Sequence, residues 1–297
     1  MGFLKTLKEK VFKQDLENYE NAGMIFMVRL LFEERCRMPM PDDMDEIMDK
    51  HLGNTKMLSY SDEMTGFMAK NYKVHYEDDD DLPVQLLIMK CIEIDKPIMD
   101  GLEISQLWDC PNAEEILKSC KYQVVANDML ASGLEHKVRA EMLVNFIEAL
   151  VEMYPTCKAV VIENSKKMFT REDIINCNKP MEQKFIHYAV NVRSFNVDGT
   201  DDKIVDTIGM STLYLPDLQY HFTGVDTKDV VNHAYNLLSY IYDDKNPIES
   251  GNTVDGLKQG LINIDVQWKV QYEESLVQPI REVLDVNMGN YAAGNRQ

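Results

Sequence analysis

The order of apolar segments between residues 23 and 128 limits the folds open to this chain. Four short runs have the apolar content or the alternation typical of strands, at residues 23–32, 65–76, 82–94 and 122–128. An acidic helical pattern over residues 41–53 separates the first two runs. A second helix is predicted near residue 112, where Asn112 and Glu115 have capping-box spacing. The order strand, helix, strand, strand, helix, strand predicts a ferredoxin-like βαββαβ arrangement.

Two amphipathic helices dominate the rest of the chain, at residues 135–155 and 226–244, and each has an apolar stripe at helical spacing. Strand patterns occur at residues 158–164 and 261–272. Asp198-Gly199 is a strong turn pair within a hairpin predicted over residues 185–210. The predicted fold class is therefore α+β: a ferredoxin-like βαββαβ first half packed against a second α+β half with a mixed or antiparallel sheet.

No linker rich in glycine, proline or serine separates the halves, so we expect one continuous body. Its predicted parts are an N-terminal amphipathic helix, a ferredoxin-like lobe, a second α+β lobe and a loose tail, at residues 1–20, 21–130, 131–287 and 288–297. Residues 1–14 place Phe3, Leu7 and Val11 on one helical face and lysines on much of the rest. Such a helix either docks on its own domain or lies on a membrane surface.

The charge of the chain narrows the class of its partners. Its 50 acidic residues outnumber its 31 basic residues, which gives a formal net charge of −19. This charge repels phosphate backbones, so nucleic acid is not expected as a ligand, and it suits a soluble protein that meets a basic partner. No apolar run approaches the ~20 residues of a transmembrane helix, and the N-terminus lacks the apolar core of a secretory signal. We therefore expect a cytoplasmic protein.

Two acidic segments are candidate docking surfaces for a basic partner. One is the helix predicted over residues 41–53, and the other is a loop between two predicted strands. The candidate residues are Asp42, Asp43, Asp45, Glu46, Glu77, Asp78, Asp79, Asp80 and Asp81. The adjacent carboxylates from residue 77 onward lack the alternate spacing and the glycine of a calcium loop. A solvated loop is therefore favoured over a cation site.

The usual catalytic signatures are missing from the sequence. It contains no P-loop, no G-x-G-x-x-G and no H-E-x-x-H, so no cofactor and no metal are expected. The six cysteines include no C-x-x-C pair, and free thiols are expected. The polar residues that a hydrolase would use are His136, His221, Thr253 and Asp255. The last two belong to the segment SGNTVDG, residues 250–256, which either lines a pocket with Asn252 or is a plain turn.

Residues 105–125, SQLWDCPNAEEILKSCKYQVV, combine a tryptophan with two cysteines. Trp108 is predicted to be a core anchor that covers the end of the following helix. Cys110 and Cys120 lie at opposite ends of that helix, so that about eight residues separate them by about 12 Å. This separation exceeds what a disulfide permits. The stretch is therefore interpreted as structural.

Several phrases give the chain a resemblance to a known family. They are LWDCPNAEEILKSCKYQVV, HKVRAEMLVNFIEAL, CKAVVIEN, YAVNVRSFNVDG, IGMSTLYLPDLQY, VVNHAYNLLSYI and SGNTVDG. From about residue 24 to residue 256, the chain resembles the bacterial domain-of-unknown-function family 4261. The resemblance implies a bacterial or phage source and a cytoplasmic location. It implies no reaction, cofactor or substrate.

The acidic charge and the missing signatures favour a non-catalytic protein-interaction module over an enzyme. One form of this hypothesis is an immunity or defence-associated protein that is steered electrostatically onto a basic partner. The alternative hypothesis is a hydrolase with an unmarked active site, for which the four polar residues His136, His221, Thr253 and Asp255 would have to converge.

Overall fold

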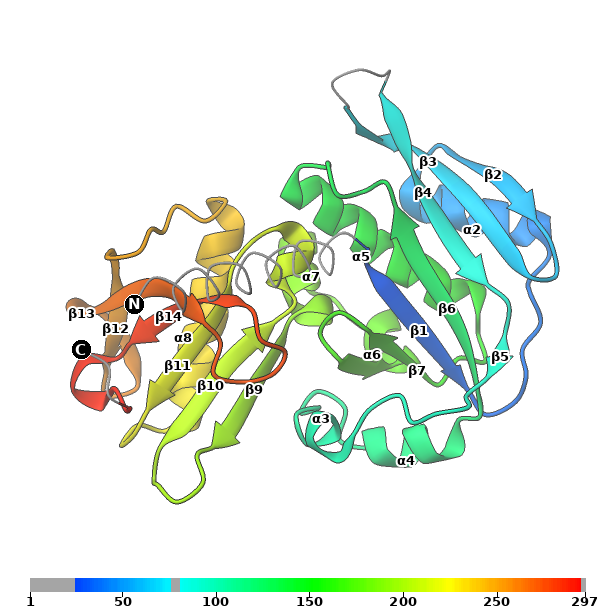
Figure 1. Cartoon of the computed structure of the whole chain (residues 1–297). Coiled ribbons are helices and arrows are strands. Elements are labelled where there is room, and N and C mark those ends of the chain that lie inside the picture. The colour runs from blue at the N-terminus through cyan, green and yellow to red at the C-terminus, as the bar shows by residue number, and fades with distance from the viewer. Residues whose placement is uncertain (1–24, 76–80, 295–297) are drawn as a thin grey trace, which may run out of the picture. The chain divides into compact units, whose positions relative to one another are not determined.

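The computed structural model of the chain describes residues 25–75 and 81–294. The chain forms two compact units, each with its own sheet; one unit ends at Ala189 and the other begins at Val190 (Figure 1). The helix predicted at residues 1–20 lies outside the described residues. Among the helices that the structure describes, none is long and apolar enough to cross a membrane.

The unit that ends at Ala189 is built on an eight-stranded sheet with the order β2-β3-β4-β6-β1-β7-β8 and a short β5 beside β6. Its strand pairs are antiparallel. The strands are β1 Met27–Phe32, β2 Thr55–Tyr60, β3 Met64–Val74, β4 Leu82–Met89, β5 Ile92–Glu93, β6 Tyr122–Met129, β7 Ala159–Ile162 and β8 Lys167–Thr170. The helices are α2 Pro41–Leu52, α3 Gly101–Ser105, α4 Ala113–Ser119, α5 His136–Met153, α6 Arg171–Ile175 and α7 Met181–Ala189.

Strand β1 is covered on both faces. Its side chains alternate, so Leu30 and Leu31 point to opposite faces of the sheet although both are fully buried. Leu31 packs in an apolar cluster with Ala113 of α4 and Met168 of β8. Leu30 shares its face with Phe32, whose ring packs edge-on against Tyr154 at the end of α5, with 5.8 Å between the centroids. Helices α2 and α5 pack side by side on that face (Figure 1).

A buried ion pair fixes α5 to the sheet. Arg139 Nη2 of α5 donates a hydrogen bond to Asp128 Oδ2 of β6 at 3.0 Å, and both side chains are almost completely buried. The backbone N–H of Phe26 donates to the other oxygen of Asp128 at 2.6 Å. Burial raises the pKa of Asp128, and the Arg139 guanidinium opposes that shift. The ion pair thus connects α5 to β6, and the Phe26 contact extends the connection to the residue before β1.

The α+β class is confirmed, whereas the strand order differs from that of a ferredoxin-like sheet. In a ferredoxin-like sheet the first strand lies between the third and fourth strands of the motif. Here β6 pairs with both β1 and β4 and separates them. The boundary predicted near residue 130 also differs from the observed one. Because α5 packs on α2 and β7 pairs with β1, residues 131–189 complete the first unit instead of starting a second.

Two local predictions near residue 110 are wrong. Trp108 is 47% exposed and is no core anchor, because Leu107 and Cys110 take the buried positions of that turn and pack in the cluster around Leu31. Asn112 makes no side-chain cap on α4, since its amide oxygen instead accepts a hydrogen bond from the Cys110 thiol at 3.6 Å. All six cysteines are free thiols, as predicted.

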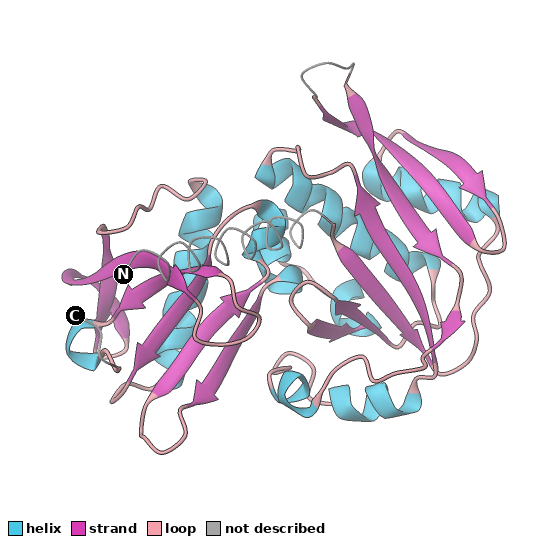
Figure 2. Cartoon of the chain, in the orientation of Figure 1, coloured by secondary structure: helices cyan, strands magenta, loops and turns pink. Residues whose placement is uncertain are grey.

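The unit that begins at Val190 is built on a six-stranded mixed sheet with the order β12-β13-β14-β11-β10-β9. Strands β11 and β14 run parallel, and the other neighbours run antiparallel. The strands are β9 Asn191–Asn196, β10 Lys203–Ile208, β11 Asp217–Phe222, β12 Thr253–Lys258, β13 Leu261–Glu274 and β14 Glu282–Asn287. Helix α8, Thr227–Asp243, packs against this sheet (Figure 2). It buries Val230, Ala234, Leu238 and Ile241 completely.

Two further predictions need correction in their bounds. The hairpin around Asp198-Gly199 is confirmed between β9 and β10. Its predicted start at residue 185 is wrong, because residues 185–189 belong to α7, whose apolar residues are buried at helical spacing. The segment from residue 288 to Gly294 is no loose tail, since Met288 is buried and Ala292 forms a β-bridge with Phe222.

Buried charges connect three strands of this sheet to the segment before β14. Arg281 Nη2 donates to Asp206 Oδ2 at 2.8 Å and to the carbonyl oxygen of Thr207 at 2.6 Å. Its Nε lies 3.6 Å from Asp217 Oδ2. Arg193 Nε of β9 donates to the other oxygen of Asp206 at 2.9 Å. The Asp206 and Asp217 carboxylates are fully buried. The guanidinium groups therefore offset the free-energy cost of removing these two charges from water.

Replacing Arg281 by methionine should destabilise this unit by about 3–5 kcal/mol, because the Asp206 and Asp217 carboxylates lose that buried guanidinium. Urea unfolding monitored by circular dichroism measures the change. The matched control is Arg37→Met, because Arg37 is exposed, and we expect it to change the free energy of unfolding by less than about 0.5 kcal/mol. Equal stability of the two variants would contradict the role assigned to Arg281.

Candidate functional site

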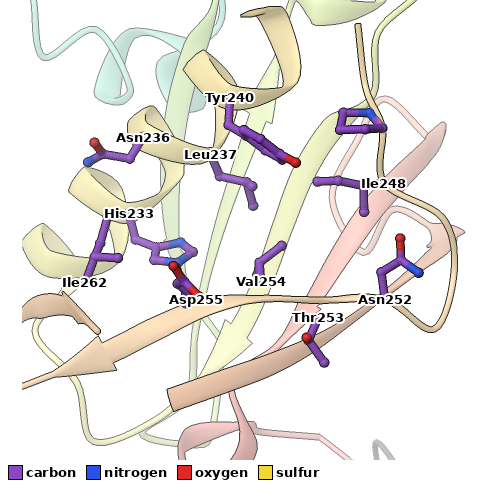
Figure 3. Close-up of a pocket in the computed structure, with 11 residues that line it drawn as sticks. His233, Asn236, Leu237, Tyr240, Ile248, Asn252, Thr253, Val254, Asp255 and Ile262 are labelled. Carbon is purple, nitrogen blue, oxygen red and sulfur yellow. The ribbon is translucent and has the colours of Figure 1, made fainter. Parts of the chain in front are cut away.

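A pocket of about 420 Å³ lies in the unit that begins at Val190 (Figure 3). Its walls come from α8, from β12, from the segment that joins them and from the start of β13. The lining residues are His233, Asn236, Leu237, Tyr240, Pro247, Ile248, Asn252, Thr253, Val254, Asp255 and Ile262. Figure 3 shows Leu237 of α8 pointing toward Val254 of β12, whereas Asn236 points away from the strand. About half of the lining side chains are apolar, and Asp255 is the one carboxylate among them.

A stack of rings holds α8 against the two strands below it. A Cβ atom added to Gly256 would lie 2.6–2.8 Å from three atoms of the Trp268 indole, which is closer than side chains approach one another. Glycine at this position therefore allows the indole of β13 to lie directly on β12. The Trp268 ring in turn lies 5.0 Å from the ring of His233, measured between centroids.

His233 is held by a hydrogen bond at each ring nitrogen. Its Nδ1 lies 2.9 Å from the Tyr220 hydroxyl, and its Nε2 lies 2.6 Å from the backbone carbonyl oxygen of Asp255. A carbonyl oxygen only accepts hydrogen bonds, so Nε2 carries the proton and Nδ1 accepts from the tyrosine. Burial lowers the pKa of His233, and the Asp255 carbonyl opposes this shift. The neutral imidazole thus links α8 to β11 and β12.

Two of the four polar residues singled out in the sequence, Thr253 and Asp255, lie side by side and share one partner. Gln267 of β13 accepts a hydrogen bond from Thr253 Oγ1 at 2.7 Å and donates one from Nε2 to Asp255 Oδ1, also at 2.7 Å. The Thr253 hydroxyl thus donates its hydrogen bond to the Gln267 amide oxygen. The Gln267 amide nitrogen in turn holds one oxygen of Asp255 in a fixed orientation. In this arrangement the threonine hydroxyl donates to an amide oxygen and not to a base.

Next to the pocket, the β12–β13 hairpin extends beyond the rest of the sheet. Strand β13 pairs with β14 only from Lys269 onward, whereas its pairing with β12 begins at Leu261. The first half of β13 therefore has one neighbouring strand instead of two. Leu261 and Ile264 are 74% and 75% exposed, and Ile262, which lines the pocket, is 46% exposed.

The four polar residues of the hydrolase hypothesis fall into separate surroundings. Thr253 and Asp255 line the pocket. His221 lies on β11, outside the pocket lining, with its Nε2 3.4 Å from Asp202 Oδ2. His136 is buried at the start of α5 in the other unit, where its ring pairs with Glu135. No group of three or more histidine, cysteine, aspartate or glutamate side chains among the described residues is arranged to hold a metal ion.

The acidic candidates differ in what the structure describes of them. Asp42, Asp43, Asp45 and Glu46 are exposed on α2, whose buried residues are Met44, Met48 and Leu52. Asp81 is exposed and pairs with His75, whose Nδ1 lies 3.1 Å from its Oδ1. Residues 77–80 lie outside the described part of the chain.

Sequence reasoning missed three residues that shape the pocket: His233, Tyr240 and Gln267. His233 and Tyr240 are seven residues apart on one helix, which is the spacing of a shared face. That signal was available in the sequence. Gln267 gave no such signal, because its role depends on the register that places it opposite Asp255.

The pH dependence of stability should report the buried, neutral state of His233. Since burial lowers its pKa, the unfolded chain binds more protons than the folded chain below the ordinary histidine pKa of about 6.5. The stabilisation is present above that pH and is lost as the pH falls through it. We expect His233→Gln to flatten the fall in the free energy of unfolding between about pH 7 and pH 5.

Fluorescence of Trp268, which lies beside His233, reports this unit directly. The sequence has two tryptophans, so a Trp108→Phe background leaves Trp268 as the single fluorophore. The control is His75→Gln, because His75 is exposed on the other unit. If His233→Gln and its parent show the same pH slope in urea titrations, the assigned state of His233 is wrong.

Comparison with known proteins bears on this same unit. A family model described as Domain of unknown function (DUF4261) matches residues 206–287. This match confirms the predicted resemblance for that stretch; the phrases before residue 206 lie outside it. The matched stretch contains the pocket, the projecting hairpin and Arg281 with both of its carboxylate partners. No curated protein and no solved structure matches the chain.

Proposed function

We propose that this chain is a non-catalytic protein-interaction module that docks through the pocket and the projecting hairpin. The observation that carries the proposal is the exposure of Leu261 and Ile264 beside a pocket that itself presents apolar side chains. Apolar side chains gathered on a surface with a polar rim are typical of protein–protein interfaces. A pocket next to them supplies a place for an anchoring side chain of the partner.

The charge of the chain supports a basic partner. A net charge of −19 attracts a positive protein surface and speeds its association at low salt. An immunity or defence-associated protein that neutralises a basic toxin domain is the form of this function that we favour. Free thiols suit a reducing compartment, and we propose a cytoplasmic location.

A hydrolase is the second candidate, because Thr253, Asp255 and His233 do meet in one pocket. A general base must accept a proton from the nucleophile, however, and His233 uses its accepting nitrogen for the Tyr220 hydroxyl. The distinguishing assay is hydrolysis of ester, amide and phosphoester substrates. Turnover that Thr253→Ala and Asp255→Asn both abolish would favour the hydrolase over the interaction module.

Placing charge on the hairpin should abolish docking. We expect the double variant Leu261→Lys/Ile264→Lys to bind the native partner at least about tenfold more weakly, because two lysines would be buried at an apolar interface. Cross-linking capture from the native host at low salt identifies the partner, and calorimetry with the purified partner gives the dissociation constant.

The matched control is Leu102→Lys/Ile175→Lys. These two apolar side chains are 59% and 52% exposed and lie in the other unit, so the control makes the same charge change away from the hairpin. Capture of the same partner by wild type, control and hairpin variant with equal affinity would exclude the hairpin as the docking surface.

The acidic face of α2 should contribute to the association rate. We expect the fourfold variant Asp42→Asn, Asp43→Asn, Asp45→Asn, Glu46→Gln to slow association with the basic partner and to reduce its dependence on salt, with a smaller effect on dissociation. Stopped-flow measurements at two ionic strengths test this. The control neutralises four exposed acids elsewhere, at Glu34, Glu115, Glu182 and Asp198. Equal slowing in both variants would mean that net charge alone acts, and that α2 is no docking surface.

A further inference from the structure

The pocket has two chemically different sides. Leu237, Tyr240, Ile248 and Ile262 give it an apolar wall, and Asp255 gives it a carboxylate (Figure 3). Of these residues, Tyr240 and Ile262 are each 46% exposed, so the wall is open to a ligand from outside. A ligand that fills this pocket must offer apolar surface along its length and a group that satisfies a carboxylate at one end.

The Asp255 carboxylate is oriented but not neutralised. Gln267 Nε2 donates to its Oδ1 at 2.7 Å, and this amide is itself fixed by the Thr253 hydroxyl. Throughout residues 25–75 and 81–294, no lysine, arginine or histidine side chain forms an ion pair with Asp255. The carboxylate therefore keeps its charge available for a cation that enters the pocket.

We propose that the pocket receives an arginine side chain of the basic partner. This inference rests on the proposed function and names the residue that the pocket recognises. The guanidinium donates to Asp255, and the aliphatic stem packs on the apolar wall. The aromatic ring of Tyr240 on that wall offers a face to the delocalised cation.

Charge complementarity selects this occupant over a second copy of the chain. A pair of copies would bring together two molecules that each carry a net charge of −19. Arginine also suits the site better than lysine, because its planar fork matches a carboxylate whose orientation is already fixed. A pocket of about 420 Å³ has room for the whole side chain and part of its neighbours.

The test uses the full chain and the blocked peptide acetyl-Gly-Arg-Gly-amide, with binding followed by NMR. The comparison peptide replaces arginine by citrulline, which has nearly the same shape and no charge. We expect the arginine peptide to shift the resonances of Tyr240, Asp255 and Gln267, and to bind at least about tenfold more tightly than the citrulline peptide. The lysine peptide should lie between them.

Two variants locate the binding. Asp255→Asn keeps the shape of the side chain and should reduce the affinity for the arginine peptide to that for citrulline. Tyr240→Ala removes an exposed ring and should weaken binding several-fold. Asp265→Asn is the control, because Asp265 is exposed on the same hairpin and does not line the pocket. Equal binding of the arginine and citrulline peptides, or an Asp255→Asn variant that binds the arginine peptide as wild type does, would overturn the proposal.

The hairpin variant, the Asp255→Asn variant and the two peptides together distinguish this inference from the proposed function. If the native partner is lost with Leu261→Lys/Ile264→Lys but retained with Asp255→Asn, the interaction module stands and the arginine pocket is wrong. If the hairpin variant also retains the partner, the docking surface itself is wrong. Displacement of the captured partner by the arginine peptide, and not by the citrulline peptide, would support both.

Discussion

The length of β13 relative to β14 is the constraint on which the candidate site depends. Strand β13 spans Leu261–Glu274, while β14 spans only Glu282–Asn287 and pairs with the second half of β13. The first half must therefore leave the sheet with β12 as its only partner. Apolar residues there cannot reach the core, so they remain exposed beside the pocket. A longer β14 would cover this edge and remove the surface.

The polar residues of the pocket serve the fold more than they serve chemistry. His233 has a partner at each ring nitrogen, and Gln267 binds Thr253 and Asp255 together. Buried or half-buried polar groups that satisfy one another rigidify a site. What they leave without a cationic partner is the fixed carboxylate of Asp255, to which we assign recognition in the proposed module. This balance is the reason that we propose binding, and not catalysis, as the role of the pocket.

The sequence predicted the elements more successfully than their arrangement. Periodicity located α2, α5 and α8 within a few residues, because each buries an apolar stripe. The order of strands in the first sheet was not predictable, since β6 could satisfy its two-sided burial next to β1 or β4 and in fact pairs with both. Trp108 was misjudged for a related reason: burial of Leu107 and Cys110 already fills that turn. Thr253 and Asp255 were identified from their polar segment, but the role of Gln267 follows only from strand register.

Exposed apolar residues and a high negative charge are complementary in this chain. An apolar hairpin on a neutral protein would promote self-association through its exposed side chains and its free strand edges. A net charge of −19 opposes the approach of another copy while it favours a basic surface. In the interaction module that we propose, the apolar hairpin supplies affinity without selectivity of its own, and the charge supplies the selectivity. On this argument, neutralising the acidic surface should relax the choice of partner before it abolishes binding, because repulsion of unwanted partners is lost first.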